Sequence, residues 1–303
     1  MKKRIPFLFY LLTLFSTSLF AQKLYPVLDD SVDPQLQIQL QASLNNLGLN
    51  KPATDKKLAL ALVDITHPQN PKVAAINGNE MMYAASLPKI AILLGAFERI
   101  ESGVMELDKD NRDLMTQMIR NSSNQAATTM LRKVGKQHLA ELLQSPRYKL
   151  YDQDRNGGLW VGKEYGKSPA WRRDPLHNLS HGATAMQVAR FYYYLETNRL
   201  VSAELTVDMK EILSNPAINH KFVKGLKKVH PDSEIYRKSG SWRQFHADSA
   251  IVERDGRRYI AVGLAENQAG GQWLSQLIVE MDKLIFSGQK LTDAASVSND
   301  AGA

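Results

Sequence analysis

A serine and a lysine three residues apart stand at the head of an apolar segment. Ser86-Leu87-Pro88-Lys89 precedes a run that is apolar on every side, and this predicts a buried helix over residues 86–102. Residues three apart lie on one face of a helix, so Lys89 can reach the Ser86 hydroxyl. A serine becomes a nucleophile when a base takes its proton, and a lysine becomes such a base when burial lowers its pKa. The pattern therefore indicates acyl transfer through Ser86.

A second motif, Ser122-Ser123-Asn124, opens a later segment in which apolar residues recur at helical spacing. A hydroxyl here can pass a proton towards a leaving nitrogen, and the Asn124 amide can hold a substrate carbonyl and Lys89. The simpler interpretation is helix capping, which serine does well. Alone, this motif does not indicate a site.

A third motif, Lys238-Ser239-Gly240, ends a predicted strand. Lys238 and Ser239 can bind a carboxylate, and Gly240 lets a substrate backbone approach closely. The alternative is an edge-strand lysine before a turn. Each motif alone is weak, since Ser287-Gly288-Gln289-Lys290 also matches the Ser-x-x-Lys pattern. The conjunction and the order of the three motifs give them weight.

Hydrophobic periodicity predicts the elements that must position these motifs. Strands are expected over 57–65, 72–76, 234–238, 247–254 and 258–265, with an Asp255-Gly256 hairpin turn. Helices are expected over 35–47, 86–102, one or two segments within 107–134, 136–143, 184–197, 202–213 and 271–286. The order predicts an α+β fold in which terminal helices cover a five-stranded antiparallel sheet. The sheet lobe would be about 35–85 and 230–288, and an all-helical lobe, about 86–229, would be inserted between strands two and three.

The three motifs, in this order, resemble the Ser-x-x-Lys, Ser-Asp-Asn and Lys-Thr/Ser-Gly triple of class A β-lactamases and penicillin-binding proteins. The resemblance spans about residues 35–286, and the predicted layout resembles that family's fold. It implies that Ser86 is acylated and that Lys89 activates it. It also implies that Ser122 relays a proton and Asn124 positions the substrate.

The same resemblance gives roles to the segment around the third motif. Lys238 and Ser239 would hold the substrate carboxylate beside Gly240. The backbone N–H groups of Ser86 and Ser241 would form the oxyanion hole. Arg243 and His246, which follow the motif, could line the pocket, with Arg243 as a further carboxylate anchor.

The chain departs from the family pattern in three places. Ser123 stands where Asp is usual, and the connection from Ser86 to Ser122 is short, which predicts a more open site. The loop that supplies the deacylating glutamate matches only in part. There Asp174 and Asn178 would take the Glu and Asn roles, Glu164 is a second candidate base, and an ordinary turn before Pro175 is an equal alternative.

The resemblance implies hydrolysis of β-lactam amides through an acyl-enzyme. Asp174 has a shorter side chain than glutamate, so deacylation is expected to be slow. One alternative is a D,D-peptidase or transpeptidase acting on the D-Ala-D-Ala stems of peptidoglycan. A non-catalytic wall-binding or sensor protein on the same fold and an esterase with another substrate are further alternatives.

Composition bounds the other possibilities. The 303 residues contain no cysteine, so disulfides, thiolate metal sites and cysteine nucleophiles are excluded. His177 and His181 lie in the long irregular loop rather than on a helix, so no paired-histidine helix offers a zinc site, and neither a metal nor a cofactor is expected. Net charge is +7 with scattered cations. The lysine-rich run at 221, 224, 227 and 228 indicates a solvated helix face rather than a nucleic-acid surface.

The N-terminal segment has the pattern of a secretory signal, with Lys2, Lys3 and Arg4 before an apolar run that ends at Ala21. Cleavage near Ala21 predicts a secreted or periplasmic protein without a membrane anchor. We expect one catalytic domain over 22–288, followed by a disordered tail over 289–303. The protein is expected to be a monomer. Its partners would be small β-lactams or peptidoglycan stem peptides.

Overall fold

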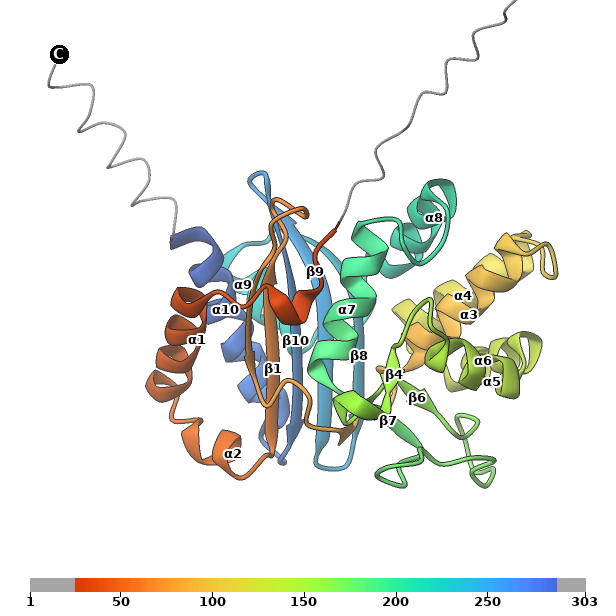
Figure 1. Cartoon of the computed structure of the whole chain (residues 1–303), viewed down its shortest axis with the longest axis horizontal. Helices are drawn as coiled ribbons and strands as arrows, with labels where there is room; N and C mark the ends of the chain where they lie inside the picture. Colours follow the sequence, from red (N-terminus) through yellow and green to blue (C-terminus); the bar gives the residue numbers. More distant parts are fainter. Residues whose placement is uncertain (1–24, 288–303) are drawn as a thin grey trace, which may run out of the picture.

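Five strands form one antiparallel sheet in the order β2-β1-β10-β9-β8. The computed structural model describes residues 25–287 (Figure 1). The strands are β1 (Leu58–Asp64), β2 (Lys72–Ile76), β8 (Glu234–Trp242), β9 (Phe245–Arg254) and β10 (Arg257–Glu266). The Asp255-Gly256 turn joins β9 to β10 with φ angles of 49° and 73°, as a two-residue hairpin requires. The predicted sheet is confirmed.

Alternating residues of the sheet separate two hydrophobic cores. On β1, one core receives Leu58, Leu60 and Leu62, whereas the other receives Ala59, Ala61 and Val63. Side chains of a strand point to opposite faces in turn, so both faces of this central strand are covered. The nearly unbroken apolar sequence of β1 follows from that double burial.

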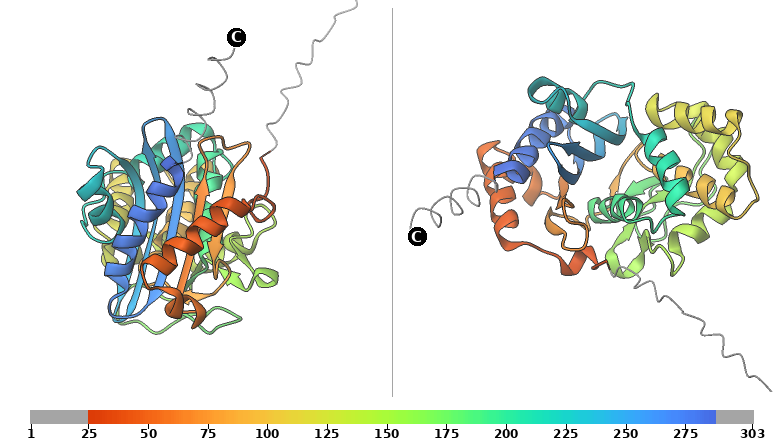
Figure 2. Two further views of the ribbon diagram at one scale, coloured as in Figure 1. Left: turned by 90° about the vertical axis from the view of Figure 1, so that its left-hand side faces the viewer. Right: turned by 90° about the horizontal axis from the view of Figure 1, so that it is seen from above.

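Terminal helices cover one face of the sheet. They are α1 (Pro34–Asn46) and α10 (Gly270–Ser287), with the short helices α2 (Asn50–Thr54) and α9 (Phe222–Val229) beside them. The left panel of Figure 2 shows α1 and α10 together on this face. The Asp33 carboxylate caps α1 by accepting the Leu36 N–H at 2.8 Å. Helix α2 was not predicted from the sequence, and α9 was indicated only as a solvated helix face.

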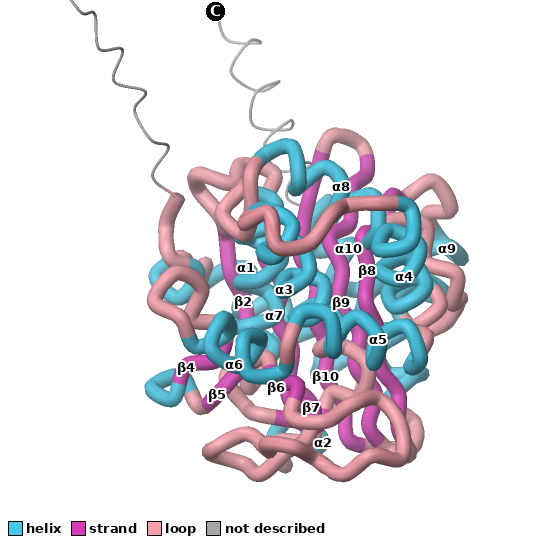
Figure 3. Tube along the Cα trace, turned by 90° about the vertical axis from the view of Figure 1, so that its right-hand side faces the viewer, coloured by secondary structure: helices cyan, strands magenta, loops and turns pink. Residues whose placement is uncertain are grey.

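The opposite face carries the helices that build the site. They are α3 (Lys89–Glu101), α4 (Lys109–Arg120), α5 (Asn124–Val134), α6 (Lys136–Gln144), α7 (Ala185–Glu196) and α8 (Ala203–Leu213). Figure 3 shows α4, α5 and α6 in front of the sheet. Helix α7 packs directly on β1 and β10, and α9 joins the core on the other face. The segment 86–229 is therefore only partly a separate helical lobe.

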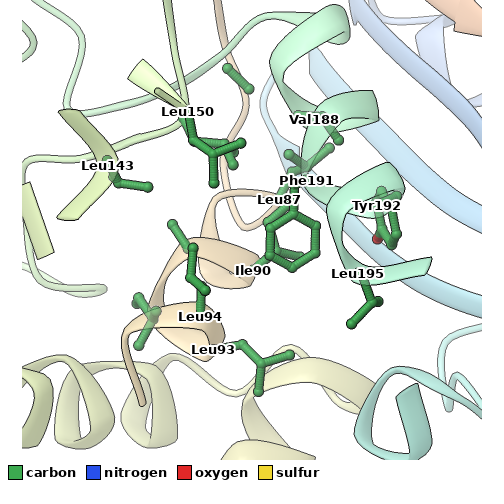
Figure 4. Close-up of a cluster of buried hydrophobic side chains, with 14 of the residues drawn as sticks. Leu87, Ile90, Leu93, Leu94, Leu143, Leu150, Val188, Phe191, Tyr192 and Leu195 are labelled. Atoms are coloured by element: carbon green, nitrogen blue, oxygen red, sulfur yellow. The ribbon is translucent and has the colours of Figure 1, made fainter. Parts of the chain in front are cut away.

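Helix α3 runs through the middle of the larger core. Leu87, Ile90 and Leu94 belong to the same buried cluster as Phe191 and Val188 of α7, and the close-up in Figure 4 shows Leu87 and Ile90 beside Phe191. A helix that is apolar on every side must be surrounded by protein. The burial predicted for this helix is confirmed, and it fixes the position of the turn that precedes it.

The irregular stretch 144–182 contains very short strands. These are β4 (Tyr151–Asp152), β5 (Gly157–Gly158) and β6 (Trp160–Val161), with β7 (His181–Ala183) at the end of the stretch. The 3-10 helix η2 (Gln153–Arg155) lies between β4 and β5. Strands β6 and β7 join β3 (Met82–Tyr83) in a small second sheet, in the order β3-β7-β6. Another 3-10 helix, η1 (Leu28–Asp30), lies before α1. Segments of two or three residues are too short for periodicity to reveal.

Two predicted regions, the leader 1–21 and the tail 289–303, lie outside the described residues. The second match to the Ser-x-x-Lys pattern, which begins at Ser287, also lies mostly outside them. Between residues 25 and 287, no helix combines the length and the apolar character that crossing a membrane would require.

Candidate active site

Ser86 lies in a tight turn that leads into α3. The helix begins at Lys89 rather than at Ser86. The residues before it form backbone hydrogen bonds between positions three apart, as in a turn, rather than four apart, as in an α-helix. Leu87 N donates to Ala84 O at 3.0 Å, and Lys89 N donates to Ser86 O at 3.3 Å. Ala85, just before the serine, has a φ of +50°, an unfavourable backbone conformation for a residue with a side chain. This turn presents Ser86 at the helix N-terminus, partly exposed.

Ser86 opens onto a pocket of about 290 Å³. Ser86, Asn124 and Ser241 of the predicted site line it, together with residues of the loop between β6 and β7, whereas Lys89, Ser122, Lys238 and Ser239 are not among the lining residues. The lining includes Tyr83, Ser86, Asn124, Lys163, Glu164, Tyr165, His181, Ser241 and Trp242. A substrate that reaches Ser86 therefore passes between this loop and the end of β8.

Lys89 is fully buried beside the second motif. Its Nζ donates to Ser122 O at 2.6 Å, to Asn124 Oδ1 at 2.8 Å and to Ser123 O at 3.3 Å. Burial lowers the pKa of Lys89 to about 7, since a charge is disfavoured away from water. A lysine with that pKa is neutral in a large fraction of molecules near pH 7, so it can accept a proton.

The two serines of the second motif have different roles. Ser123 Oγ caps α5 by accepting the Ala126 N–H at 3.1 Å, which is the capping role that the sequence left open. Ser122 has a φ of +57°, and its Oγ accepts a hydrogen bond from Lys238 Nζ at 2.9 Å. Asn124 is the first residue of α5. Ser122 thus contacts both Lys89 and Lys238, whereas Asn124 contacts Lys89.

The third motif lies on β8, the edge strand of the sheet. Lys238 and Ser239 are both buried. Burial, and next the charge of Lys89, hold the pKa of Lys238 well below its usual value. A Cβ added to Gly240 would lie 2.2 Å from Ala84 O and 2.7 Å from Ser86 N. Only glycine permits this approach, which brings β8 against the backbone of the Ser86 turn.

Comparison with known proteins agrees with this arrangement. The sequence model described as "Beta-lactamase enzyme family" matches residues 39–111 and 110–287. The chain belongs to this family. No curated protein matches it in sequence. The resemblance predicted from the three motifs, to a penicillin-recognising β-lactamase-like serine hydrolase, is confirmed at the level of the family.

Solved structures of the β-lactamase fold are similar over most of the chain. A structure of PBP-A has 16% sequence identity and a TM-score of 0.63, covering 86% of this chain and 97% of that one. A class A β-lactamase from Bacteroides cellulosilyticus DSM 14838 has 16% identity and a TM-score of 0.63, with 83% and 97% covered. An ancestral (GNCA) class A β-lactamase has 18% identity and a TM-score of 0.63, with 84% and 100% covered. At these identities the likeness shows the fold.

In this member of the β-lactamase family, Asp174 does not reach the Ser86 pocket. Its buried carboxylate instead accepts hydrogen bonds from Tyr151 OH at 2.9 Å and from the backbone N–H groups of Leu176, His177 and Leu179. These contacts tie its own loop together. The placement expected of a base is therefore corrected, because both carboxylate oxygens serve the loop.

Asn178 and Arg243 are exposed and, unlike Asn124 and Ser241, do not line the pocket. Asn178 is exposed, has a φ of +56° and accepts through its backbone carbonyl from Arg173 at 3.1 Å. Arg243 is an exposed turn residue with a φ of +51°, and its guanidinium lies 5.6 Å from the Trp242 ring. The structure therefore brings neither side chain to Ser86.

Glu164 lines the pocket, but its carboxylate is already paired. Arg132 and Lys136 each lie 2.7 Å from its oxygens. The hydrogen bonds of Arg132 and then of Lys136 lower the pKa of Glu164 to about 2. A carboxylate with so low a pKa is a weak base. Its two partners hold the loop against α5 and α6.

Lys221 is a residue that the sequence analysis placed wrongly. It was expected on a solvated face, yet it is only 4% exposed. Its Nζ donates to Gly240 O at 2.5 Å, Ser241 Oγ at 2.7 Å and Ala247 O at 3.1 Å. Burial lowers its pKa to about 8. Only its position just before the apolar pair Phe222-Val223 could have suggested burial.

Basic side chains outnumber acidic side chains beneath the end of β8. Asp248 is buried there, but Arg237 already pairs with it through two hydrogen bonds of 2.6 and 2.7 Å. Lys89, Lys221 and Lys238 are then left among neutral acceptors. Over residues 25–287, no three acidic or histidine side chains group closely enough to hold a metal ion. The arrangement favours an anionic group at Ser86.

Proposed function

We propose that Ser86 is acylated by β-lactam amides and that the resulting ester is hydrolysed slowly. The observation that carries this proposal is the continuous set of contacts from Lys89 through Ser122 to Lys238, with Asn124 also bound to Lys89. These contacts join all three motifs at one pocket that Ser86 opens onto. The family of the chain supports a hydrolase.

In the proposed acylation, Ser86 Oγ forms a bond to the amide carbonyl carbon while its proton passes to neutral Lys89. The carbon–nitrogen bond then breaks, and the leaving nitrogen receives a proton through Ser122 Oγ. The N–H groups of Ser86 and Ser241 would stabilise the oxyanion, as expected for this kind of acyl transfer. Lys89, with a pKa of about 7, is suited to this exchange near neutral pH.

The substrate proposed here carries a carboxylate. Lys238 and Ser239 would bind it, and the buried Lys221 would add positive potential from below the strand. A buried cation without an anionic partner is costly, so a bound carboxylate would relieve an imbalance present in the free protein. Both β-lactams and D-Ala-D-Ala peptides have such a group.

A D,D-peptidase acting on peptidoglycan stems is the second candidate, and one observation favours it. Both loop carboxylates, Asp174 and Glu164, are engaged in other contacts. Without a free carboxylate to activate water, hydrolysis of a β-lactam adduct would be slow, as is typical of a penicillin-binding enzyme. The predicted leader would place either activity outside the cytoplasm, where the protein would act as a monomer.

Intact-mass spectrometry after mixing with a penicillin tests the proposal. The wild type should gain the mass of the penicillin on the peptide that contains Ser86, and Ser86→Ala should gain nothing. An adduct that lasts for many minutes with little product favours the peptidase, whereas a rapid return to free enzyme favours the β-lactamase. If no acylating probe labels Ser86, a non-catalytic binding protein becomes the better interpretation.

A further inference from the structure

An aromatic ring covers the buried lysine of the site. Lys89 Nζ lies 4.5 Å from the centroid of the Tyr165 ring. The phenol of Tyr165 donates to Ala85 O at 3.4 Å, next to Ser86. Tyr165 also lines the Ser86 pocket. One side chain therefore extends from the lysine to the backbone that carries the nucleophile.

The loop around Tyr165 is held from several sides. Thr128 of α5 donates through Oγ1 to Tyr165 O at 3.1 Å. The neighbouring Glu164 pairs with Arg132 and Lys136. On the other side, the His181 ring lies 4.3 Å from the Tyr165 ring. These contacts fix the ring over Lys89.

The arrangement matters for the second half of an acyl-enzyme reaction. Hydrolysis forms a bond from a water oxygen to the ester carbon and breaks the bond to Ser86 Oγ. One water proton must go to a base, while Oγ takes up a proton. Lys89 is 0% exposed, its donors are directed at three protein acceptors, and the ring of Tyr165 lies over it.

We propose that Tyr165 is a positioning residue that keeps water away from Lys89 and from the Ser86 ester, and so prolongs the life of the acyl-enzyme. Tyr165 cannot replace the missing base, because burial holds the phenol in its neutral form. This inference rests on the proposed acylation of Ser86. The inference adds a second cause of slow ester hydrolysis: the Tyr165 ring blocks the approach of water, in addition to the lack of a free carboxylate.

The experiment follows the decay of a penicillin adduct by intact-mass spectrometry in wild type, Tyr165→Ala and Tyr165→Phe. Removing the ring should shorten the adduct lifetime on the order of tenfold or more, since small changes in the placement of reacting groups change rates by such factors. Tyr165→Phe keeps the ring and should leave the lifetime unchanged. Tyr194→Ala, which removes a ring 4.3 Å from Arg199, is the control for loss of a cation–ring contact elsewhere.

Tyr165→Val is a second variant that retains apolar packing if the alanine variant unfolds, and it should also shorten the lifetime. Unchanged or longer lifetimes in folded Tyr165→Ala or Tyr165→Val would overturn the inference. If the wild type forms no adduct on Ser86, the proposed function itself fails. The two failures are therefore distinguishable.

Discussion

Lys238 Nζ donates a hydrogen bond to Ser122 Oγ over 2.9 Å. This contact joins the edge strand β8 to the turn before α5, elements that lie more than a hundred residues apart in sequence. The ammonium also donates to Ser239 O at 2.7 Å. A lysine held by two neutral oxygens retains donor capacity for an incoming carboxylate, and the negative charge of that carboxylate would favour the protonated form of Lys238.

Lys238→Ala should therefore slow acylation by carboxylate-bearing substrates more than acylation by neutral esters. A hydrogen bond to a charged group contributes about 1.5–3 kcal/mol, which corresponds to roughly 10- to 100-fold in rate. Acylation rates of a penicillin and of its methyl ester, measured on wild type and variant, give the comparison. Equal losses for both substrates would refute carboxylate binding by Lys238.

The acylation rate should rise with pH and reach a plateau above about pH 8. Lys89 must be neutral to take the Ser86 proton, and burial lowers its pKa to about 7. Below that value the lysine is protonated, so the rate falls as pH falls. Time-resolved adduct formation between pH 5.5 and 8.5 measures the midpoint, with Lys89→Arg as the inactive control. A rate that is flat over this range would argue against Lys89 as the base.

Glu164→Gln distinguishes a loop clamp from a catalytic base by the sign of its effect. If Glu164 activated water, the variant would lengthen the life of the adduct. Its contacts with Arg132 and Lys136 instead hold the loop that carries Tyr165. We therefore expect the lifetime to shorten severalfold as the ring loosens over Lys89. Adduct decay at pH 7 measures this, and a longer lifetime would restore Glu164 as a base.

Asp174→Asn should lower stability without changing the decay of the adduct. The substitution turns one of the two Asp174 carboxylate oxygens into an amide NH₂ group, which donates instead of accepting. In this buried site, either the Leu179 N–H or the Tyr151 hydroxyl then loses its acceptor. Loss of a hydrogen bond to a buried charged group costs about 1.5–3 kcal/mol. Urea unfolding should show this loss, and Tyr151→Phe, which removes one neutral donor, should cost less. Faster or slower adduct decay in a folded Asp174→Asn variant would contradict a purely structural role.

The fold was predictable because its long elements have clear periodicity. The apolar run of β1 predicts a strand and the all-round apolar sequence of α3 predicts a buried helix, and the structure contains both, each in the core. The buried face of helix α9 was not predicted, although Phe222 and Leu226 lie four residues apart. Its lysines suggested a solvated surface, and the burial of Lys221 depends on acceptors from β8 and β9 that only the tertiary structure supplies.

The candidate site was predictable to a different degree in its two halves. Ser86, Lys89 and Lys238 are recognised by local motifs, and the structure brings their segments together. Asp174 was chosen by its place before Pro175. Its carboxylate, however, is satisfied by N–H groups two to five residues later in the chain. Tyr165 has no motif at all, because its importance lies in a contact with a residue that is distant in sequence.

The order of strands in the sheet has a consequence for how the protein is made. Strand β10, near the end of the described chain, inserts between β9 and β1 and pairs with β1 from Leu58 through Asp64. The partners of this contact are about two hundred residues apart, and such non-local pairing slows folding. Strand β1 can pair with β2 early, but a ribosome must complete almost the whole domain before β1 finds its second neighbour, β10. A nascent chain that stops before β10 would carry all three motifs and still lack the strand that joins the β1–β2 pair to the β8–β9 pair.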